Sequence, residues 1–139
     1  MRRSAARVYV LDSFALLSCL QNGAGAERVE AILRQGKAGQ AELWLSIINY
    51  GEVLYVTERE QGLEAAHEAA AAIDRLPIQV EQAGRKLTFS AAHIKATLPL
   101  AHADAFALAL ALEVGGRVVT GDPEFRKAEP LVAVEWLPR

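Results

Sequence analysis

The sequence has little cysteine and no long apolar run. Cys19 is the only cysteine among 139 residues, so no internal disulfide can form and nothing requires an oxidising compartment. Its apolar neighbours favour an inert core thiol over a nucleophile. The apolar stretch 105–112 is far too short to cross a bilayer, and Asp12 interrupts the N-terminal region that loosely resembles a signal peptide. We therefore expect a cytoplasmic protein without a membrane segment.

The chain also lacks an excess of charge of either sign. Its 15 Lys and Arg and 17 Asp and Glu give a net charge of −2, which argues against strong non-specific binding of nucleic acid through a basic face. A nucleic-acid enzyme whose bound metal supplies the positive charge is not excluded. Because 52% of the residues are apolar and no linker or repeat is present, we expect one domain over 1–139 with its core at about 7–136.

Several common catalytic motifs are missing. The sequence has no glycine-rich phosphate loop, no cysteine pair suited to zinc and no serine in a nucleophile elbow. The three histidines, His67, His93 and His102, have no recognisable ligand spacing. Carboxylates placed among apolar segments are therefore the strongest candidates for a functional site.

Strand-like and helix-like segments alternate along the chain. Strands are expected at residues 7–12, 42–46, 78–80, 117–120 and 133–136, and helices at 13–20, 26–35, 46–61, 63–76, 83–95 and 103–114. This order predicts a single-domain α/β/α sandwich with a mostly parallel central sheet flanked by helices. In such folds the ligand site lies beyond the carboxyl ends of the strands.

Two aspartates follow predicted strands. Asp12 ends the run 8–11, and Asp122 comes two residues after the strand 117–120. Each has an alternative role as a helix cap, because Asp followed by Ser or by Pro is a common helix start. Since the carboxyl ends of parallel strands share one sheet edge, both aspartates are also candidates for one shared site.

Two further acids lie in the most apolar helices. Glu52 lies within 47–56, with Asn49 one turn earlier on the same face, and its alternative role is a boundary residue whose head reaches water. Asp104 lies in the first turn of the helix 103–114, where the helix dipole stabilises a carboxylate. Apolar residues on both faces of that helix, up to residue 112, predict a helix packed all round and favour a buried carboxylate.

The four acids together suggest a metal site. A carboxylate buried among aliphatic residues costs several kcal/mol unless a positive or hydrogen-bonding group faces it. Acids gathered from separate elements can bind one or two Mg²⁺ or Mn²⁺ ions through oxygen ligands. Such ions activate an attacking water and stabilise a phosphoryl transition state. The sequence thus predicts a metal-dependent hydrolase.

A family resemblance supports this prediction. The segments that carry it, with their acids spaced by 40, 52 and 18 residues, are Val8-Tyr9-Val10-Leu11-Asp12-Ser13, Asn49-Tyr50-Gly51-Glu52-Val53, Ala103-Asp104-Ala105 and Thr120-Gly121-Asp122-Pro123-Glu124-Phe125. In order and spacing the chain resembles the PIN-domain ribonucleases, and in length it is similar to the VapC toxins of toxin–antitoxin pairs. The resemblance covers residues 7–136.

The resemblance implies an endoribonuclease toxin that uses Mg²⁺ or Mn²⁺ to hydrolyse RNA, forms a homodimer and is inhibited by a cognate antitoxin. The residues it implies are Asp12, Glu52, Asp104 and Asp122 as catalytic metal ligands, with Ser13, Asn49 and Thr120 as supporting groups. The turn Asn49-Tyr50-Gly51 departs from the family pattern, because many members have Ser or Thr there. The basic start Arg2-Arg3 has no assigned role.

Three other functions compete with this hypothesis. A non-catalytic PIN-like interaction module would keep the same acids, so only an activity assay separates the two. A phospho-acceptor signalling domain would need paired acids after the first strand and a lysine after the last, and this chain has neither. A metal-dependent phosphatase would need an Asp-x-Asp motif, but Phe14 occupies the second position.

Overall fold

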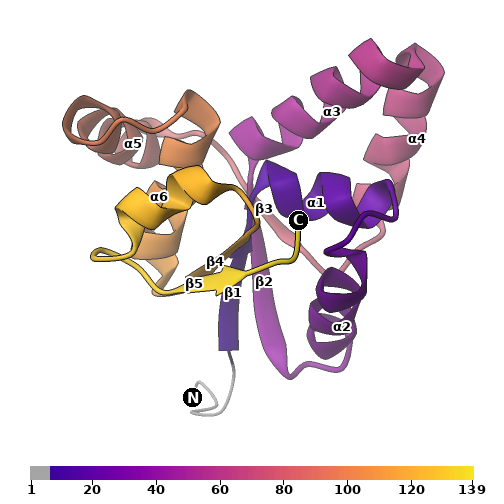
Figure 1. The fold of residues 1–139 in the computed structure, drawn as a ribbon, viewed down its shortest axis with the longest axis horizontal. Coiled ribbons are helices and arrows are strands. Elements are labelled where there is room, and N and C mark those ends of the chain that lie inside the picture. Colours follow the sequence, from indigo (N-terminus) through magenta and orange to yellow (C-terminus); the bar gives the residue numbers. More distant parts are fainter. Residues whose placement is uncertain (1–6) are drawn as a thin grey trace.

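The computed structural model describes residues 7–139 and contains a sheet with the strand order β3-β2-β1-β4-β5 (Figure 1). The strands are β1 (Arg7–Leu11), β2 (Ala41–Ser46), β3 (Gln79–Glu81), β4 (Arg117–Thr120) and β5 (Val134–Trp136). All neighbouring strands pair in parallel, so the predicted α/β class is confirmed, with a sheet that is parallel throughout. Residues 1–6, which include the basic start Arg2-Arg3, lie outside the described residues.

The helices agree with the predicted order and differ at their ends. They are α1 (Ser13–Leu20), α2 (Ala26–Lys37), α3 (Ile47–Gln61), α4 (Leu63–Asp74), α5 (Arg85–Thr97), α6 (His102–Val114) and the short 3₁₀ helix η1 (Pro123–Ala128). The helix predicted at 63–76 ends two residues earlier, because Arg75 and Leu76 form a tighter turn on Ala72 and Ile73. The helix predicted at 83–95 is shifted towards the C-terminus and begins after Gly84.

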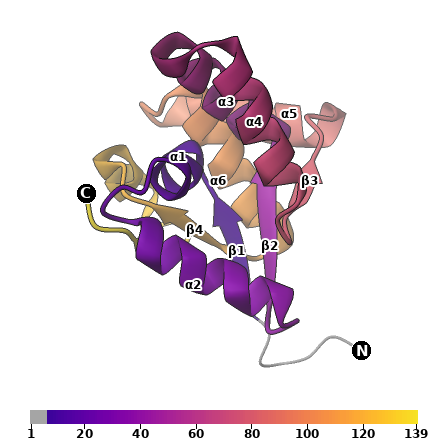
Figure 2. The ribbon, with the colours of Figure 1, turned by 90° about the vertical axis from the view of Figure 1, so that its right-hand side faces the viewer.

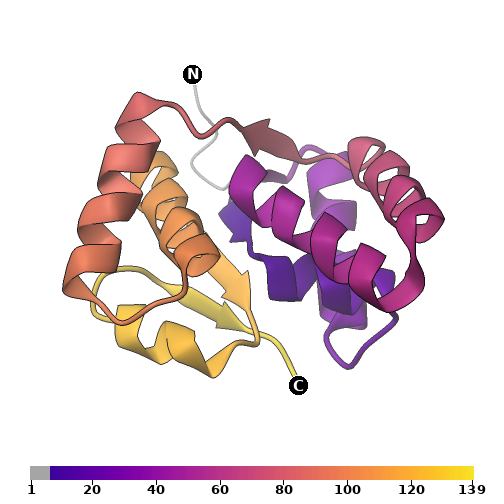
Figure 3. The same ribbon diagram turned by 90° about the horizontal axis from the view of Figure 1, so that it is seen from above.

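Each face of the sheet has its own core. Val10 of β1 and Val118 of β4 pack with α5 and α6. The alternate residues Tyr9, Leu11 and Val119 pack with helices α1 to α4. Successive strand side chains point to opposite faces, so each strand contributes to both cores. Both faces of the sheet are therefore covered by helices, as is typical of a parallel sheet. Figure 3 shows α5, α6 and η1 on one side of the strands and α1 to α4 on the other, and Figure 2 shows α2 lying along the sheet.

Helix α3 leaves the sheet at the end of β2 and forms a pair with α4. Its N-cap is Ser46, whose hydroxyl oxygen accepts hydrogen bonds from the backbone N–H groups of Ile48 (3.0 Å) and Asn49 (3.2 Å). At its end Gly62 has φ +97°, a conformation that L side chains rarely adopt, so the chain turns sharply into α4. Helices α3 and α4 then run side by side above the sheet (Figure 1).

Helix α6 is the most buried helix of the described chain. Residues 103–111 are all buried, which confirms the predicted packing, but Leu112 is 46% exposed and the prediction was wrong there. The last turn of α6 reaches the surface, where Leu112 borders an open cavity with Gly116 and Leu131. No single described helix is long and apolar enough to span a membrane; α5 and α6 pass that test only as a pair bent by 119°.

Candidate functional site

Asp12 is the most buried of the four predicted acids, with 1% of its surface exposed. Its Oδ1 accepts a hydrogen bond from the backbone N–H of Ala15 at 2.8 Å and caps α1. Its Oδ2 accepts a short hydrogen bond from the hydroxyl of Thr120 at the end of β4. The capping role and the buried-acid role are therefore filled by the same residue. No cation pairs with Asp12 in the part of the chain that the structure describes.

Asp122 is coupled to Asp12 through Thr120. The backbone N–H of Asp122 donates to the Thr120 hydroxyl oxygen at 3.0 Å, and Asp122 Oδ1 caps η1 by accepting from the N–H of Glu124 at 2.9 Å. Between them, Gly121 lies against the ring of Phe14. A Cβ on Gly121 would approach the Phe14 ring to 2.3 Å, so any larger residue in this turn would force the ring to shift. Asp122 thus caps η1, which is the alternative role considered from the sequence, and the same turn links it through Thr120 to Asp12.

Asp104 and Glu52 come from helices on opposite faces of the sheet. Asp104 is buried in the first turn of α6 but caps no backbone N–H; the N-cap position is Ala101. Glu52, in the second turn of α3, is half-buried, and its Oε2 accepts a hydrogen bond from the hydroxyl of Tyr55 at 3.3 Å. Because α3 contacts α6 beyond the sheet edge, the two carboxylates come within electrostatic range of each other.

The supporting residues join α1 to α3. The Ser13 hydroxyl donates to the backbone oxygen of Asn49 at 3.3 Å, and Asn49 Nδ2 donates to Ser13 Oγ at 3.1 Å. Asn49 is completely buried, and its Oδ1 has no hydrogen-bond partner among the described residues. A buried amide oxygen without a partner is costly and often marks the place of a water or ion. Two of the three predicted supporting residues, Ser13 and Asn49, are thus in contact with each other, and the third, Thr120, contacts Asp12.

The electrostatics of the site favour neutralisation of its acids. Burial, with smaller contributions from the charges of Asp104 and Asp122, raises the pKa of Asp12 to about 8 against the lowering effect of its two hydrogen bonds. Burial also raises the pKa of Asp104 to about 7, with additional contributions from Asp122, Glu52 and Glu124. Asp12, Asp104 and Asp122 are therefore coupled as like charges at the carboxyl edge of the sheet, and Glu52 acts on Asp104.

A divalent ion fits the donor set by charge and chemistry. The site offers oxygen ligands only, which Mg²⁺ and Mn²⁺ prefer, and its buried carboxylates have no cation partner in the described chain. Within residues 7–139, however, no three acidic, histidine or cysteine side chains converge closely enough to ligate one ion. Mg²⁺ usually retains several waters and uses one or two carboxylates, so a closed cage of protein ligands is not required.

Two contacts at the site were not predicted from the sequence. Glu124, which is exposed, raises the pKa of Asp104 and pairs with Lys127. The Nζ of Lys127 lies 3.1 Å from Glu124 Oε1 and 3.3 Å from the backbone oxygen of Pro99. Tyr55 contacts Glu52 from the next turn of α3. The spacing of three residues within one helix could have indicated the Tyr55 contact, whereas nothing in the sequence indicates that η1 meets the loop before α6.

The chain was compared with known proteins and structures. The PIN domain family model matches residues 9–130, which is most of the chain. Curated protein sequences give no match. PIN-domain nucleases generally use divalent metal ions.

Several solved structures have the same fold. VapBC2 from Rickettsia felis, bound to a DNA fragment from its promoter, is 14% identical with a TM-score of 0.74 over 94% of this chain and 99% of that one. DNA-bound VapBC from Salmonella typhimurium is 18% identical with a TM-score of 0.74 over 93% and 97%. VapC20 from Mycobacterium tuberculosis, a toxin that cleaves the sarcin–ricin loop, is 21% identical with a TM-score of 0.71 over 94% and 99%. With its parallel sheet, its acids at the strand ends and a family match over residues 9–130, the chain belongs to the PIN-domain family.

Proposed function

We propose that this protein is a metal-dependent endoribonuclease whose metal site is formed by Asp12, Glu52, Asp104 and Asp122. The observation that carries the proposal is the burial of Asp12 and Asp104 without any cation partner in the described chain. A buried carboxylate without a cation partner costs free energy. Two such carboxylates near each other therefore indicate a site at which a bound cation neutralises their charge. Membership of the PIN-domain family supports the same chemistry.

The residues divide into holding and orienting groups. Asp12 and Asp104 would hold Mg²⁺ or Mn²⁺, with Glu52 and Asp122 at its periphery. A bound ion lowers the pKa of water and stabilises charge on a phosphoryl group. Thr120 fixes the Asp12 carboxylate by its hydrogen bond, and Ser13 with Asn49 fixes α3, which carries Glu52. The substrate phosphate would approach from the open side, beyond the strand ends.

We further propose that the protein is the toxin of a toxin–antitoxin pair, acts in the cytoplasm and forms a homodimer. The support is the agreement of its fold with the VapBC proteins of Rickettsia felis and Salmonella typhimurium. VapC20, the toxin that cleaves the sarcin–ricin loop, has the same fold over 94% of this chain and 99% of its own. Co-expression with the product of a neighbouring short reading frame tests this part, because a cognate antitoxin would co-purify with the chain and relieve growth arrest.

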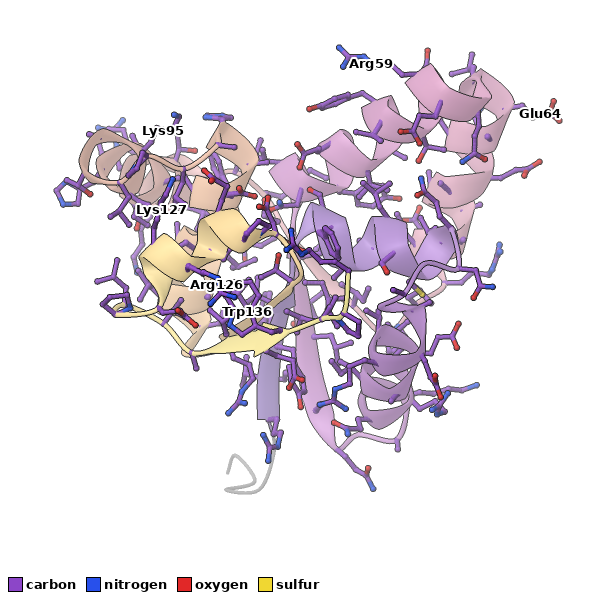
Figure 4. All side chains as sticks on the ribbon, viewed as in Figure 1. Arg59, Glu64, Lys95, Arg126, Lys127 and Trp136 are labelled. Atoms are coloured by element: carbon purple, nitrogen blue, oxygen red, sulfur yellow. The ribbon has the colours of Figure 1, made fainter. Side chains whose placement is uncertain are left out.

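The activity is tested by the substitution Asp104→Asn, which preserves shape and removes the charge. Wild-type protein should cleave single-stranded RNA with Mg²⁺ or Mn²⁺ and lose activity with EDTA. Asp104→Asn should reduce cleavage by at least roughly 100-fold, on the order of what loss of one key electrostatic group costs. The matched control is Glu64→Gln, because Glu64 is exposed on α4 and points away from the site in Figure 4. Its cleavage rate should equal that of the wild type.

The alternative function is a non-catalytic PIN-like interaction module. It predicts a folded wild-type protein that cleaves no RNA with either ion, or cleavage that Asp104→Asn leaves unchanged. Either result would contradict the ribonuclease proposal. If the wild-type protein does cleave RNA, mapping the cleaved ends in cellular RNA after induced expression would identify its substrate.

A further inference from the structure

Tyr55 is an exposed aromatic residue in direct contact with the acidic site. Its side chain lies one turn beyond Glu52 on α3 and is 48% exposed. Its hydroxyl donates to Glu52 Oε2 at 3.3 Å, so the polar edge of the ring borders the site and its faces are not used for core packing. Among the Phe, Tyr and Trp side chains of residues 7–139, Phe89 is the other one with such exposure.

Arg59 extends the same helix face outwards. Its guanidinium carbon lies 5.0 Å from the centre of the Tyr55 ring, as in a cation–π pair. It forms no ion pair with any carboxylate of the described chain, although Glu58 and Glu60 flank it in the sequence. In Figure 4 Arg59 projects from the outer end of α3 on the side that faces α5, whereas Glu64 points away. The face of α3 therefore presents, in order from the site, a carboxylate, an aromatic ring and an unpaired cation.

The aromatic ring and the cation in this order could bind the base and the phosphate of a single-stranded nucleotide. Unstacked RNA bases bind to aromatic faces and to guanidinium planes, and their phosphates bind to cations. Base–aromatic stacking tolerates many sequences because each base has a π face. An apolar partner peptide would instead require a continuous apolar patch, and here the neighbouring side chains Glu52, Glu58 and Arg59 are charged.

We propose that Tyr55 is a positioning residue on which a nucleobase next to the scissile phosphate stacks, and that Arg59 binds the following backbone phosphate. The inference rests on the proposed ribonuclease function and adds to it a binding surface for single-stranded RNA on α3. Tyr55 acts here through its ring and takes no part in the hydrolysis itself.

The test compares Tyr55→Leu with Tyr55→Phe on a short single-stranded RNA that spans a cleavage site mapped with wild-type protein. Tyr55→Leu should raise KM by about 5- to 150-fold, which corresponds to the 1–3 kcal/mol of one base stack, and leave kcat within about threefold. Tyr55→Phe keeps the ring and should leave KM within about twofold. Arg59→Gln should reduce the slope of log affinity against log salt by about 0.7, the value for one contact with a single strand.

A matched control is available on α5. Phe89 is 61% exposed, and the guanidinium carbon of Arg85 lies 4.5 Å from its ring centre, so this pair repeats the arrangement without contacting the four acids in the described chain. Phe89→Leu should leave KM and the salt slope unchanged. Replacing RNA bases one at a time by abasic nucleotides should identify one position at which Tyr55→Leu has no additional effect.

The outcomes separate this inference from the ribonuclease proposal. If wild-type protein does not cleave RNA, the proposed function fails, and the inference fails with it. If wild-type protein cleaves RNA but Tyr55→Leu has a wild-type KM, only the stacking surface is contradicted. A change of oligomeric state in Tyr55→Leu, measured by light scattering, would assign the ring to an interface between protein copies and overturn the proposal.

Discussion

At the scale of single residues, Asp12 is in the environment least suited to an ionised carboxylate. It is almost completely buried, and its two hydrogen bonds do not offset the cost of removing its charge from water. Thr120 contributes one of these bonds and also accepts the N–H of Asp122, so one hydroxyl orients two candidate ligands. A hydroxyl in this position sets the geometry of the carboxylate and the charge it presents to a ligand.

This role of Thr120 predicts a loss of metal affinity in Thr120→Val, which keeps the shape and removes the hydroxyl. Without the bond to Asp12, the pKa of Asp12 should rise further and Mn²⁺ should bind about 10- to 100-fold more weakly. Calorimetric titration with Mn²⁺ measures this. Thr57→Val is the matched control, because the buried Thr57 hydroxyl donates at 2.7 Å only within its own helix, to the backbone oxygen of Val53. Equal Mn²⁺ affinity in the two variants would contradict the assigned role.

At the scale of elements, local sequence patterns predicted the helices and strands well but did not predict the contacts between them. The continuous apolar run of β1, the N-cap Ser46 and the glycine Gly62 at the end of α3 are local signals, and the corresponding elements agree with prediction. The exposure of Leu112 was missed because periodicity gives the face of a helix but not where the neighbouring helices end. The packing of Phe14 on Gly121 was also missed, since it joins two turns that are distant in sequence.

The turn at Gly121 predicts opposite effects for the same substitution at two positions. Gly121→Ala would place a Cβ against the ring of Phe14 and should destabilise the protein by about 1–3 kcal/mol, as overpacking does. Gly51→Ala, in the exposed face of α3 with nothing within 4 Å of the new Cβ, should stabilise by about 0.5–1 kcal/mol. Urea denaturation of both variants measures the difference. A neutral Gly121→Ala would show that Phe14 can move without cost.

At the scale of the whole molecule, the four candidate acids come near one another because elements from both faces of the sheet meet beyond its carboxyl edge. The sequence proposed the four acids as candidates and predicted that Asp12 and Asp122 lie at one sheet edge, which agrees with the pairing of β1 with β4. It did not place Glu52 and Asp104, whose helices cover opposite faces. Their distance depends on the crossing of α3 and α6, which is set by packing and not by periodicity.

The gathered acids predict that the metal-free protein loses stability as the pH rises. The folded-state pKa values of about 8 for Asp12 and about 7 for Asp104 lie above the ordinary value of 3.8. Between pH 4 and 8 the folded state therefore retains protons that the unfolded state has released. The free energy of unfolding should decrease across this range by about 1.4 kcal/mol per pH unit for each retained proton and level off above pH 8.

Metal binding should reverse this trend, because an ion binds the deprotonated carboxylates and replaces the protons. Thermal midpoints between pH 6 and 8, with EDTA or with millimolar Mn²⁺, test both effects: the decrease in EDTA should disappear with Mn²⁺, and the gain from Mn²⁺ should grow with pH. Asp104→Asn removes one of the two retained protons, so it should flatten the EDTA profile and reduce the Mn²⁺ gain, while Glu64→Gln should follow the wild type. A wild-type midpoint that is independent of pH and Mn²⁺ across this range would mean that the four carboxylates do not act as one site.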